Sequence, residues 1–546
     1  MTNSRLLGVC VTLIALFALI LCRVFWVSTD TDYAVSAGAQ TVSTVALPKR
    51  RGNFYDADGQ PLTGCTKTWY ALCVPGDSSY ATLFPYVPYA QQTLLYQRRN
   101  SASPFLVQVQ KDLLASGVYT YGSEQRYLPL PIATHLLGYL DGEGHGVSGL
   151  ELAYDDLLYS AWGSEELECS TTAQGSLLAG TQPTTKTTAA GSKAGVQLTL
   201  DADIQRACEG ITQTDMPRGC IVVMDTATGR LLASVSTPEY DPNNVGKSIA
   251  ANDTSLINRP LAGFSAGSVF KVVLAAAAYE YGLDWYTWDC EGSTEVADQR
   301  FRCALGRAHG TVNLRGALEQ SCNCYFVQLG QLLGPEKLLR VAEKFGFGRA
   351  SALAPGLKSG AGRLPDAAEL ENIGQLAIFS FGQGTLSVTP LQITAMMNTI
   401  ADGGIYRPPT LVEGTLTFPD EAADRAGEPE AAPALEPAAT PESARVCTAD
   451  TARVVRSMLT SVVSEGIGQS ALPDEGGAGG KTGTAQTGQF DEAGEELLNY
   501  WFAGFYPAEA PRYTITVLQD AALEPETASA AIFARVANAL HLLENS

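Results

Sequence analysis

Histidine, basic side chains and paired metal ligands are all scarce in this sequence of 546 residues. Its 4 histidines and 12 cysteines include no Cys-x-x-Cys pair, which argues against a zinc site, so no metal and no cofactor are predicted. Its 36 lysines and arginines are outnumbered by 57 aspartates and glutamates, and the net charge is −21. A basic face that binds phosphate, and with it a nucleic-acid partner, is therefore not expected.

An apolar run at 6–27 is long enough to cross a bilayer once. Arg5 precedes it, and residues 28–48 contain aspartates but no lysine or arginine, so the charge bias places the N-terminus inside the cell. The alternative is a cleaved signal peptide. The only candidate for its small-residue cleavage site, at 34–39, lies too far beyond the apolar core. We predict that 1–27 is a short cytoplasmic tail and transmembrane signal anchor in the cytoplasmic membrane, with the rest of the chain outside.

The remaining sequence predicts two folded regions joined by a linker. Residues 28–160 form a small N-terminal pedestal region, which contains a predicted hairpin at 51–62. Residues 161–195 are rich in Thr, Ser, Gly and Ala and are expected to be a linker or exposed loop. Residues 196–546 form the main domain, in which a stretch of Pro, Ala and Glu at about 419–445 is expected to be a disordered insertion.

Hydrophobic periodicity predicts the elements of the main domain. Strands are expected at 219–225, 230–237, 482–487, 500–506 and 513–519. Helices are expected at 201–216 and 528–543, and mostly helical sequence separates the first two strands from the last three. One of these helices has a clear start, with Thr389 as N-cap, Pro390 in the first turn and Gln392 as the reciprocal cap.

Ser268 and Lys271 stand three residues apart at the start of a run that predicts a helix. Helical spacing places both on one face, about one turn apart, so the amine can reach the hydroxyl. A serine hydroxyl is a weak nucleophile until a neighbouring base activates it. This is the only Ser-x-x-Lys in the chain, but alone the pattern is also typical of an ordinary helix with a surface lysine.

Two further short motifs follow in order. The segment 321–323 (Ser-Cys-Asn) is the only Ser-x-Asn, and by itself it is equally typical of a helix cap. The segment 481–484 (Lys-Thr-Gly-Thr) opens the third predicted strand. A second, looser match at 358–360 (Lys-Ser-Gly) lies in Gly- and Pro-rich sequence without a strand signal and is set aside.

The ordered set Ser-x-x-Lys, Ser-x-Asn and Lys-Thr-Gly resembles the penicillin-recognising serine transpeptidases and β-lactamases. Residues 309–310 (His-Gly), 382–384 (Gly-Gln-Gly) and 501–505 (Trp-Phe-Ala-Gly-Phe) are also similar to penicillin-binding proteins. The hairpin at 51–62 and the segment 146–151 resemble class B, the monofunctional transpeptidases. The resemblance implies an α/β (α+β) transpeptidase/β-lactamase-like fold: a five-stranded antiparallel sheet flanked by helices, with a helical subdomain, preceded by a pedestal domain and one transmembrane helix.

The resemblance also implies roles in acyl transfer from a peptide that ends in D-Ala-D-Ala. Ser268 would attack the penultimate carbonyl, Lys271 would be the base, and Ser321 would pass the proton to the leaving D-Ala. Lys481 would hold Ser321 and attract the substrate carboxylate, and Asn323 would bind a substrate amide.

The remaining substrate contacts are expected from the 481–484 motif. The hydroxyls of Thr482 and Thr484 would bind the terminal carboxylate, with Gly483 in the same substrate-binding strand. The backbone N–H groups of Ser268 and Thr484 would form the oxyanion hole. The sequence departs from the family pattern at Ala266 and Val269, but neither change removes a reacting group.

The expected partners are peptidoglycan stem peptides, β-lactams as covalent inhibitors, the cytoplasmic membrane and a separate membrane glycosyltransferase. Two alternatives stay open: a D,D-carboxypeptidase or β-lactamase, in which water is the acceptor, and a non-catalytic β-lactam sensor or scaffold. A disulfide between Cys290 and Cys303 is a further hypothesis, conditional on an oxidising location. The sequence does not choose among division, elongation and sporulation.

Overall fold

The computed structural model describes residues 3–29, 42–74, 77–101, 103–114, 118–172, 177–178, 181–188, 193–251, 253–419 and 432–545. The chain divides into two compact units that alternate along the sequence. The first comprises Met1–Arg51, Thr66–Arg126 and Trp162–Gly191, and the second comprises Gly52–Cys65, Tyr127–Ala161 and Ser192–Ser546. Two segments of the expected 28–160 region therefore pack with the second unit. The predicted domain boundaries themselves stay a prediction.

The first unit holds the N-terminal helix α1 (Asn3–Thr29) and two small antiparallel sheets. By length and composition, the Leu7–Thr29 part of α1 is able to cross a membrane. One sheet joins β1 (Val42–Ala46), β6 (Glu165–Ser170) and β7 (Thr184–Thr187). The other joins β4 (Phe105–Val109), β3 (Thr66–Cys73) and β5 (Thr120–Gln125), with helices α3 (Asp77–Leu83) and α4 (Tyr89–Arg98) beside it.

Strands β6 and β7 lie inside 161–195, which we expected to be a linker or loop. The reason is an alternation that the surrounding Ser- and Thr-rich sequence obscures. In β6, Leu167 and Cys169 are buried, while the residues on either side of each are only half-buried. Side chains two apart lie on the same face of a strand, so β6 has one core-facing side.

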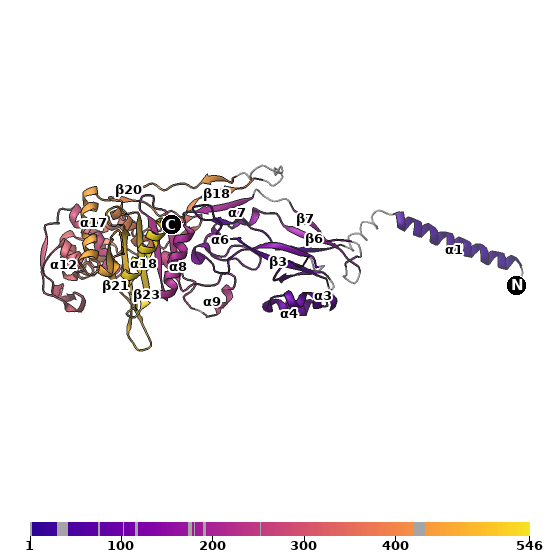
Figure 1. Ribbon diagram of the computed structural model, residues 1–546, viewed down its shortest axis with the longest axis horizontal. Coiled ribbons are helices and arrows are strands. Elements are labelled where there is room, and N and C mark those ends of the chain that lie inside the picture. Colours follow the sequence, from indigo (N-terminus) through magenta and orange to yellow (C-terminus); the bar gives the residue numbers. More distant parts are fainter. Residues whose placement is uncertain are drawn as a thin grey trace. The chain divides into compact units, whose positions relative to one another are not determined.

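The second unit is built on a five-stranded sheet with the order β10 (Leu231–Thr237), β9 (Gly219–Asp225), β23 (Tyr513–Ala522), β22 (Glu496–Tyr506) and β21 (Gly479–Phe490). Every neighbouring pair is antiparallel, which confirms the predicted five-stranded antiparallel sheet. Figure 1 labels β21 and β23 within this unit. The three C-terminal strands are longer than predicted because each continues to pair with its neighbour beyond the apolar stretch.

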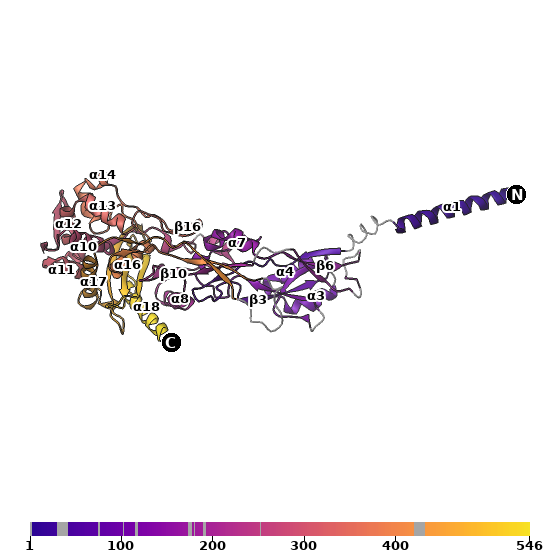
Figure 2. The ribbon, with the colours of Figure 1, turned by 90° about the horizontal axis from the view of Figure 1, so that it is seen from above.

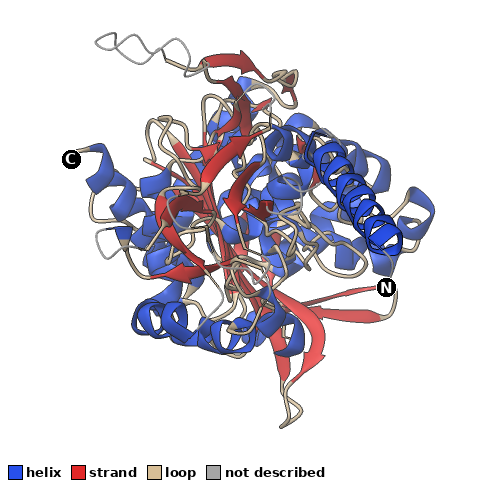
Figure 3. Cartoon of the chain, turned by 90° about the vertical axis from the view of Figure 1, so that its right-hand side faces the viewer, coloured by secondary structure: helices blue, strands red, loops and turns tan. Residues whose placement is uncertain are grey.

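Helices cover both faces of this sheet, as the strand alternation requires (Figures 1 and 2). Phe502 packs in a core with α8 (Ala202–Asp215) and α18 (Ser529–Glu544). Its neighbours Trp501 and Ala503 belong to the core on the other face, with α10 (Lys271–Glu280), α16 (Pro390–Ala401) and α17 (Ala449–Ser464). The mixture of helices and strands is visible in Figure 3.

The caps of these helices follow the sequence signals. The Thr389 hydroxyl accepts from the Gln392 backbone N–H, and the Gln392 side chain accepts from the Thr389 backbone N–H, so the predicted capping box of α16 is formed. The Asp201 carboxylate accepts from the backbone N–H groups of Asp203 and Ile204 at the start of α8. Each box or cap satisfies backbone donors that a helix N-terminus leaves unpaired.

A largely helical subdomain follows α10. Its helices are α11 (Leu314–Glu319), α12 (Asn323–Leu333), α13 (Pro335–Lys344), α14 (Ala367–Leu370) and α15 (Ile373–Phe379). Three short antiparallel pairs accompany them: β11 (Thr287–Cys290) with β14 (Gly310–Asn313), β12 (Ser293–Val296) with β13 (Gln299–Arg302), and β15 (Ala352–Ala354) with β16 (Leu357–Lys358). Helix α9 (Val245–Ala251) lies between β10 and α10 in the chain.

The two early segments of the second unit pack around a separate sheet. It has the order β19 (Ala434–Pro437), β18 (Val412–Thr417), β8 (Ala194–Leu198) and β2 (Phe54–Tyr55), and β2 and β8 are parallel. Helices α5 (Thr134–Leu137), α6 (Gly149–Ala153) and α7 (Asp155–Ser160) belong to this part. The predicted hairpin at 51–62 is formed, but it is short: Tyr55 and Pro61 form a bridge, and the backbone N–H groups of Leu62 and Asp56 donate to the carbonyl oxygens of Phe54 and Gln60 at 2.8 and 2.9 Å.

The expected disordered insertion at about 419–445 is only partly described. Residues 420–431 of that stretch lie outside the described residues. The remainder includes β19, which pairs with β18, and β20 (Ala444–Arg445), which pairs with β17 (Ile405–Tyr406). Disorder is therefore wrong for these two strands, because backbone pairing orders a Pro- and Ala-rich sequence that has no apolar pattern of its own.

Candidate active site

Ser268 lies in a 3₁₀ turn (Gly267–Phe270) that continues directly into α10. Its side chain is half-buried, and among the described residues its hydroxyl has no hydrogen-bond partner. Gly267 has φ of +59°, and a Cβ atom at this position would lie 2.5 Å from the Thr484 carbonyl oxygen. The close approach of two backbones therefore requires glycine immediately before the serine.

The Lys-Thr-Gly strand runs along this turn. A Cβ atom at Gly483 would lie 3.0 Å from Val269 Cγ1, so a side chain there would push β21 away from the serine turn. The neighbouring strand also holds the turn, because the Trp501 indole N–H donates to the Ser265 carbonyl oxygen at 3.0 Å. The structure thus brings Ser268 beside β21, with β22 behind it.

Lys271 joins the first motif to the second. Its buried Nζ donates to the Ser321 carbonyl oxygen at 2.8 Å, to Ser321 Oγ at 3.1 Å and to Asn323 Oδ1 at 2.6 Å. The Asn323 amide is held at its other end too, since Nδ2 donates to the Arg302 carbonyl oxygen at 2.9 Å. A protonated lysine only donates, so the amide oxygen must face Lys271.

Burial lowers the pKa of Lys271 to about 8, and the nearby cysteine thiols act in the opposite direction. The three hydrogen bonds of Nζ match the three N–H donors of an ammonium. When the proton leaves, one of these positions becomes a lone pair that accepts a proton. A lysine prepared in this way is suited to general-base chemistry.

Lys481 is the second buried amine of the site. Burial lowers its pKa well below the ordinary value, and the charge of Lys271 lowers it further. Its Nζ donates to the carbonyl oxygen and the hydroxyl of Thr482, at 3.1 and 3.3 Å. The expected hydrogen bond from Lys481 to Ser321 is not among those formed by the described residues. Thr482 is half-buried and Thr484 is exposed, so both lie within reach of solvent.

Ser321 is held in an unusual backbone conformation. Its φ is +51°, a left-handed value that a residue with a side chain adopts at a cost of about 1–2 kcal/mol. The Ser321 backbone N–H donates to the Leu318 carbonyl oxygen at 3.2 Å. The backbone N–H of the next residue, Cys322, donates to the Ala317 carbonyl oxygen at 2.9 Å. Strain of this kind persists where the surroundings over-determine the backbone, and here it points both the carbonyl and the hydroxyl of Ser321 at Lys271.

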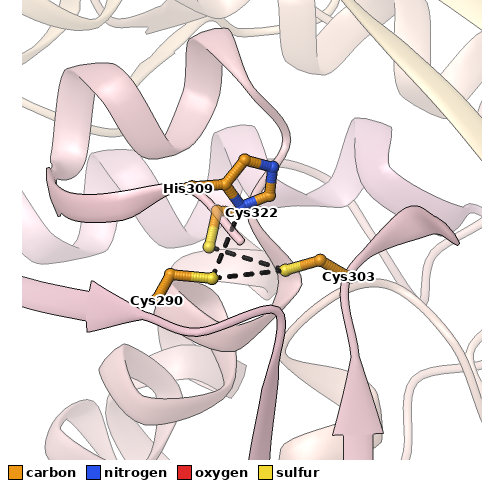
Figure 4. A group of neighbouring side chains, drawn as sticks. All are labelled: Cys290, Cys303, His309 and Cys322. Atoms are coloured by element: carbon orange, nitrogen blue, oxygen red, sulfur yellow. Dashed lines mark hydrogen bonds between the residues drawn. The ribbon is translucent and has the colours of Figure 1, made fainter. Parts of the chain in front are cut away.

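A cluster that the sequence analysis did not anticipate lies next to the second motif. Cys290, Cys303, His309 and Cys322 point toward one another, and their potential ligand atoms all lie within 4.8 Å of each other (Figure 4). The hypothesised disulfide is not formed: the Cys290 and Cys303 sulfurs are 3.7 Å apart, and both cysteines are free. A search for Cys-x-x-Cys pairs misses this cluster because tertiary folding, not local spacing, assembles it.

Most of the chain is similar to known proteins. Residues 219–540 match the family model described as the penicillin binding protein transpeptidase domain. The chain is 31% identical to stage V sporulation protein D of Bacillus subtilis, over 75% of this chain and 62% of that protein. It is 25% identical to the peptidoglycan D,D-transpeptidase MrdA of Escherichia coli, over 70% of each.

Solved structures agree with the fold. Penicillin binding protein 3 of Mycobacterium tuberculosis in its apo form has a TM-score of 0.64 and 25% identity, covering 92% of this chain and 97% of that one. The same protein complexed with aztreonam has 26% identity and the same TM-score, covering 92% of this chain and 97% of that one. The chain spans only about three fifths of the length of several relatives. Its match covers 62% of stage V sporulation protein D, and 59% and 57% of the penicillin-binding proteins PbpB of Mycolicibacterium smegmatis and Mycobacterium tuberculosis.

Proposed function

The chain belongs to the class B penicillin-binding proteins of the transpeptidase family, and on this premise we propose that it cross-links peptidoglycan as a serine D,D-transpeptidase. The observation that carries the proposal is the junction of the three motifs. Lys271 binds both Ser321 and Asn323, and the Ser268 turn lies against the β21 strand at Thr484.

In the proposed first half-reaction, the Ser268 hydroxyl attacks the penultimate D-Ala carbonyl of a stem peptide. Neutral Lys271 accepts the hydroxyl proton as the new C–O bond forms. Ser321 gives its hydroxyl proton to the departing nitrogen and receives in exchange the proton held by Lys271, to which it is hydrogen-bonded, as the C–N bond breaks. Free D-Ala leaves, and the rest of the peptide remains as an ester on Ser268.

In the second half-reaction, an amine of another stem peptide attacks the ester. Its proton returns through Lys271 to the Ser268 oxygen, which leaves as a hydroxyl, and an amide cross-link is formed. The N–H groups of Ser268 and Thr484 bind the oxyanion in both halves, and each such donor contributes roughly 3–4 kcal/mol. The hydroxyls of Thr482 and Thr484, with the positive potential of Lys481, bind the terminal carboxylate.

The cellular setting is also part of the proposal. Helix α1 anchors the protein in the cytoplasmic membrane as a single pass, with Arg5 inside and the chain that follows α1 outside. A separate membrane glycosyltransferase supplies the glycan strands. β-Lactams, which place a strained amide where D-Ala-D-Ala binds, acylate Ser268 and remain attached.

Covalent labelling of the purified protein with fluorescent penicillin tests the acylation step. Ser268→Ala is expected to abolish labelling, whereas Ser470→Ala, at an exposed serine of the same unit, is expected to label normally. Persistent labelling of Ser268→Ala would refute the assignment of Ser268 as the acylated nucleophile. Incubation with a D-Ala-D-Ala peptide and an amine acceptor then separates cross-linking from hydrolysis, because only a transpeptidase produces the amide. Rapid loss of the penicillin label would instead indicate a β-lactamase.

A further inference from the structure

A β-bulge interrupts β23 at Asp520 and Ala521, because the single residue Asn499 of β22 lies opposite both. Ala521 has a φ of +45°, a left-handed value that is uncommon for a residue with a side chain. The adjoining row of the sheet holds Thr484 of β21, which pairs with Tyr500 of β22. The bulge therefore lies next to the row of the sheet that carries a proposed oxyanion donor.

The side chain of Asn499 holds this bulge in place. It is buried, with 3% of its surface exposed, and its Oδ1 accepts from the Ala521 backbone N–H at 3.0 Å. A bulge removes a backbone donor from the regular ladder, and here the amide oxygen supplies the missing acceptor. On its other side, Asn499 is in register with Ala485 of β21, the residue after Thr484. One residue thus couples the bulge in β23 to the substrate-binding strand.

The carboxylate of Asp520 pairs with a fully buried arginine. Its Oδ2 accepts from Arg259 Nε at 2.9 Å and from Arg218 Nε at 2.9 Å. The two other nitrogens of the Arg259 guanidinium donate to the carbonyl oxygen and the hydroxyl of Thr254, at 3.1 and 2.8 Å. Each guanidinium nitrogen has an acceptor, so the buried cation is held in one position.

Arg259 begins the segment that leads to the nucleophile. Its backbone N–H donates to Ser236 Oγ at 3.1 Å, which fixes the start of this segment to β10. Farther along, Phe264 and Val388 exchange two backbone hydrogen bonds of 2.8 Å. Because the segment is held along its length, a displacement of Arg259 is transmitted to the turn that carries Ser268.

The proposed oxyanion hole depends on both ends of this network. Its two donors, the N–H groups of Ser268 and Thr484, belong to different segments, and each acts only at about 2.7–3.1 Å from the oxyanion. We propose that Asn499 and Asp520 are positioning residues of the acyl-transfer reaction, which together fix the spacing between the Ser268 turn and β21. The inference rests on the proposed function, and both residues act through the position of the backbone.

Stability alone does not account for this arrangement. A left-handed φ at Ala521 costs free energy that a regular strand would not require. The buried pair of Arg259 and Asp520 also carries a desolvation cost, which apolar side chains of similar volume would avoid. Backbone strain of this kind is typical of sites where the geometry serves a function.

Rapid-mixing measurement of penicillin acylation on the purified full-length protein separates an effect on binding from an effect on chemistry. In Asn499→Ala and Asp520→Asn, we expect the limiting acylation rate to fall about tenfold or more. The penicillin concentration that gives half of this rate should change less than about twofold. Arg512→Gln, which removes an exposed ion pair with Glu544 next to the start of β23, should match the wild-type protein in both quantities.

A boronic acid that mimics an acylated D-Ala peptide gives a readout that a loss of stability would not change. The Ser268 oxygen adds to its boron, and one oxygen of the tetrahedral adduct occupies the oxyanion hole. We expect its inhibition constant to rise in each variant by the same factor by which the acylation rate falls. Asp520→Asn removes the counter-charge of Arg259 and can misfold, so all rates are measured below the melting temperature of each variant. Asn499→Ala changes no charge and tests the inference by itself.

The outcomes separate this inference from the proposed function. Wild-type rates in both Asn499→Ala and Asp520→Asn would overturn the inference, and so would slower acylation with unchanged affinity for the boronic acid. A wild-type protein that is acylated but only hydrolyses its ester would contradict the proposed cross-linking. Lower acylation rates of the variants would still support the inference in that case, because an oxyanion forms in hydrolysis too.

Discussion

The pH dependence of acylation is the most direct test of Lys271 as the base. The perturbation is pH itself, compared between the wild-type protein and Lys271→Arg. Arginine retains the positive charge but does not deprotonate at any accessible pH. If neutral Lys271 accepts the Ser268 proton, the acylation rate must follow the fraction of Lys271 that is deprotonated.

The magnitude follows from the burial of the amine. The pKa of Lys271 falls from 10.5 to about 8 because its side chain is fully buried. This difference corresponds to about 3 kcal/mol, and it raises the neutral fraction at pH 7 from roughly 1 in 3,000 to roughly 1 in 10. The site therefore gains about 300-fold in available base at neutral pH.

The assay is the initial rate of fluorescent penicillin labelling between pH 6 and pH 9. The wild-type rate is expected to rise about 50-fold from pH 6 to pH 8 and then to level off. Lys271→Arg is expected to label at least about 10²-fold more slowly at every pH. Lys358→Arg, at an exposed lysine of the same unit, should keep the wild-type profile. A flat wild-type profile, or a normal rate in Lys271→Arg, would refute the role of Lys271.

Three further outcomes are expected. Ser321→Gly and Ser321→Ala should both label about 10²-fold more slowly than the wild-type protein, because both lose the hydroxyl. Glycine adopts the φ of +51° without strain, so Ser321→Gly should be more stable than Ser321→Ala by about 1 kcal/mol in urea unfolding. Equal stability of the two variants would contradict backbone strain at this position. Trp501→Phe removes the donor to Ser265 and should slow labelling about fivefold with the melting temperature lowered by only a few degrees, whereas an unchanged rate would show that the indole does not hold the serine turn. Burial lowers the pKa of His135 from 6.5 to about 4, so the unfolded chain binds a proton at a higher pH than the folded chain does. The contribution of neutral His135 to the free energy of unfolding is fully present above pH 6.5 and is lost as the pH falls toward 4. The loss is about 2 kcal/mol at pH 5. His135→Gln should remove this loss in urea unfolding at pH 7.5 and 5, and a wild-type loss that persists in the variant would assign it elsewhere.

Local signals in the sequence predicted the sheet and its helices well. Strand β9 has the predicted bounds because every residue from Gly219 to Met224 is buried, and a short continuous apolar run describes such a strand. The capping box of α16 is contained in four consecutive residues, so no tertiary knowledge is needed to find it.

Features that depend on contacts between distant residues were not predictable in the same way. The Ser-x-x-Lys and Ser-x-Asn motifs indicated which residues form the site, but not that Asn323 has Lys271 on one side and Arg302 on the other. The cluster of three cysteines and His309 was missed for the same reason, since its members extend from Cys290 to Cys322 along the chain. The order of the motifs can be read from the sequence, whereas the cluster beside them becomes visible only in the folded structure.

The parallel pairing of β2 with β8 sets an order of events for folding. Phe54 pairs with Val196, so two neighbours in one sheet are separated in the chain by Thr66–Arg126 and Trp162–Gly191 of the first unit. Closing so long a loop is slow, and the apolar surface that Phe54 buries stays exposed during synthesis until β8 emerges. A shortened chain that begins at residue 196 would lack Phe54, Leu136 and Leu150 from this core. Because the segments of the two units alternate along the chain, no single truncation point yields either unit by itself.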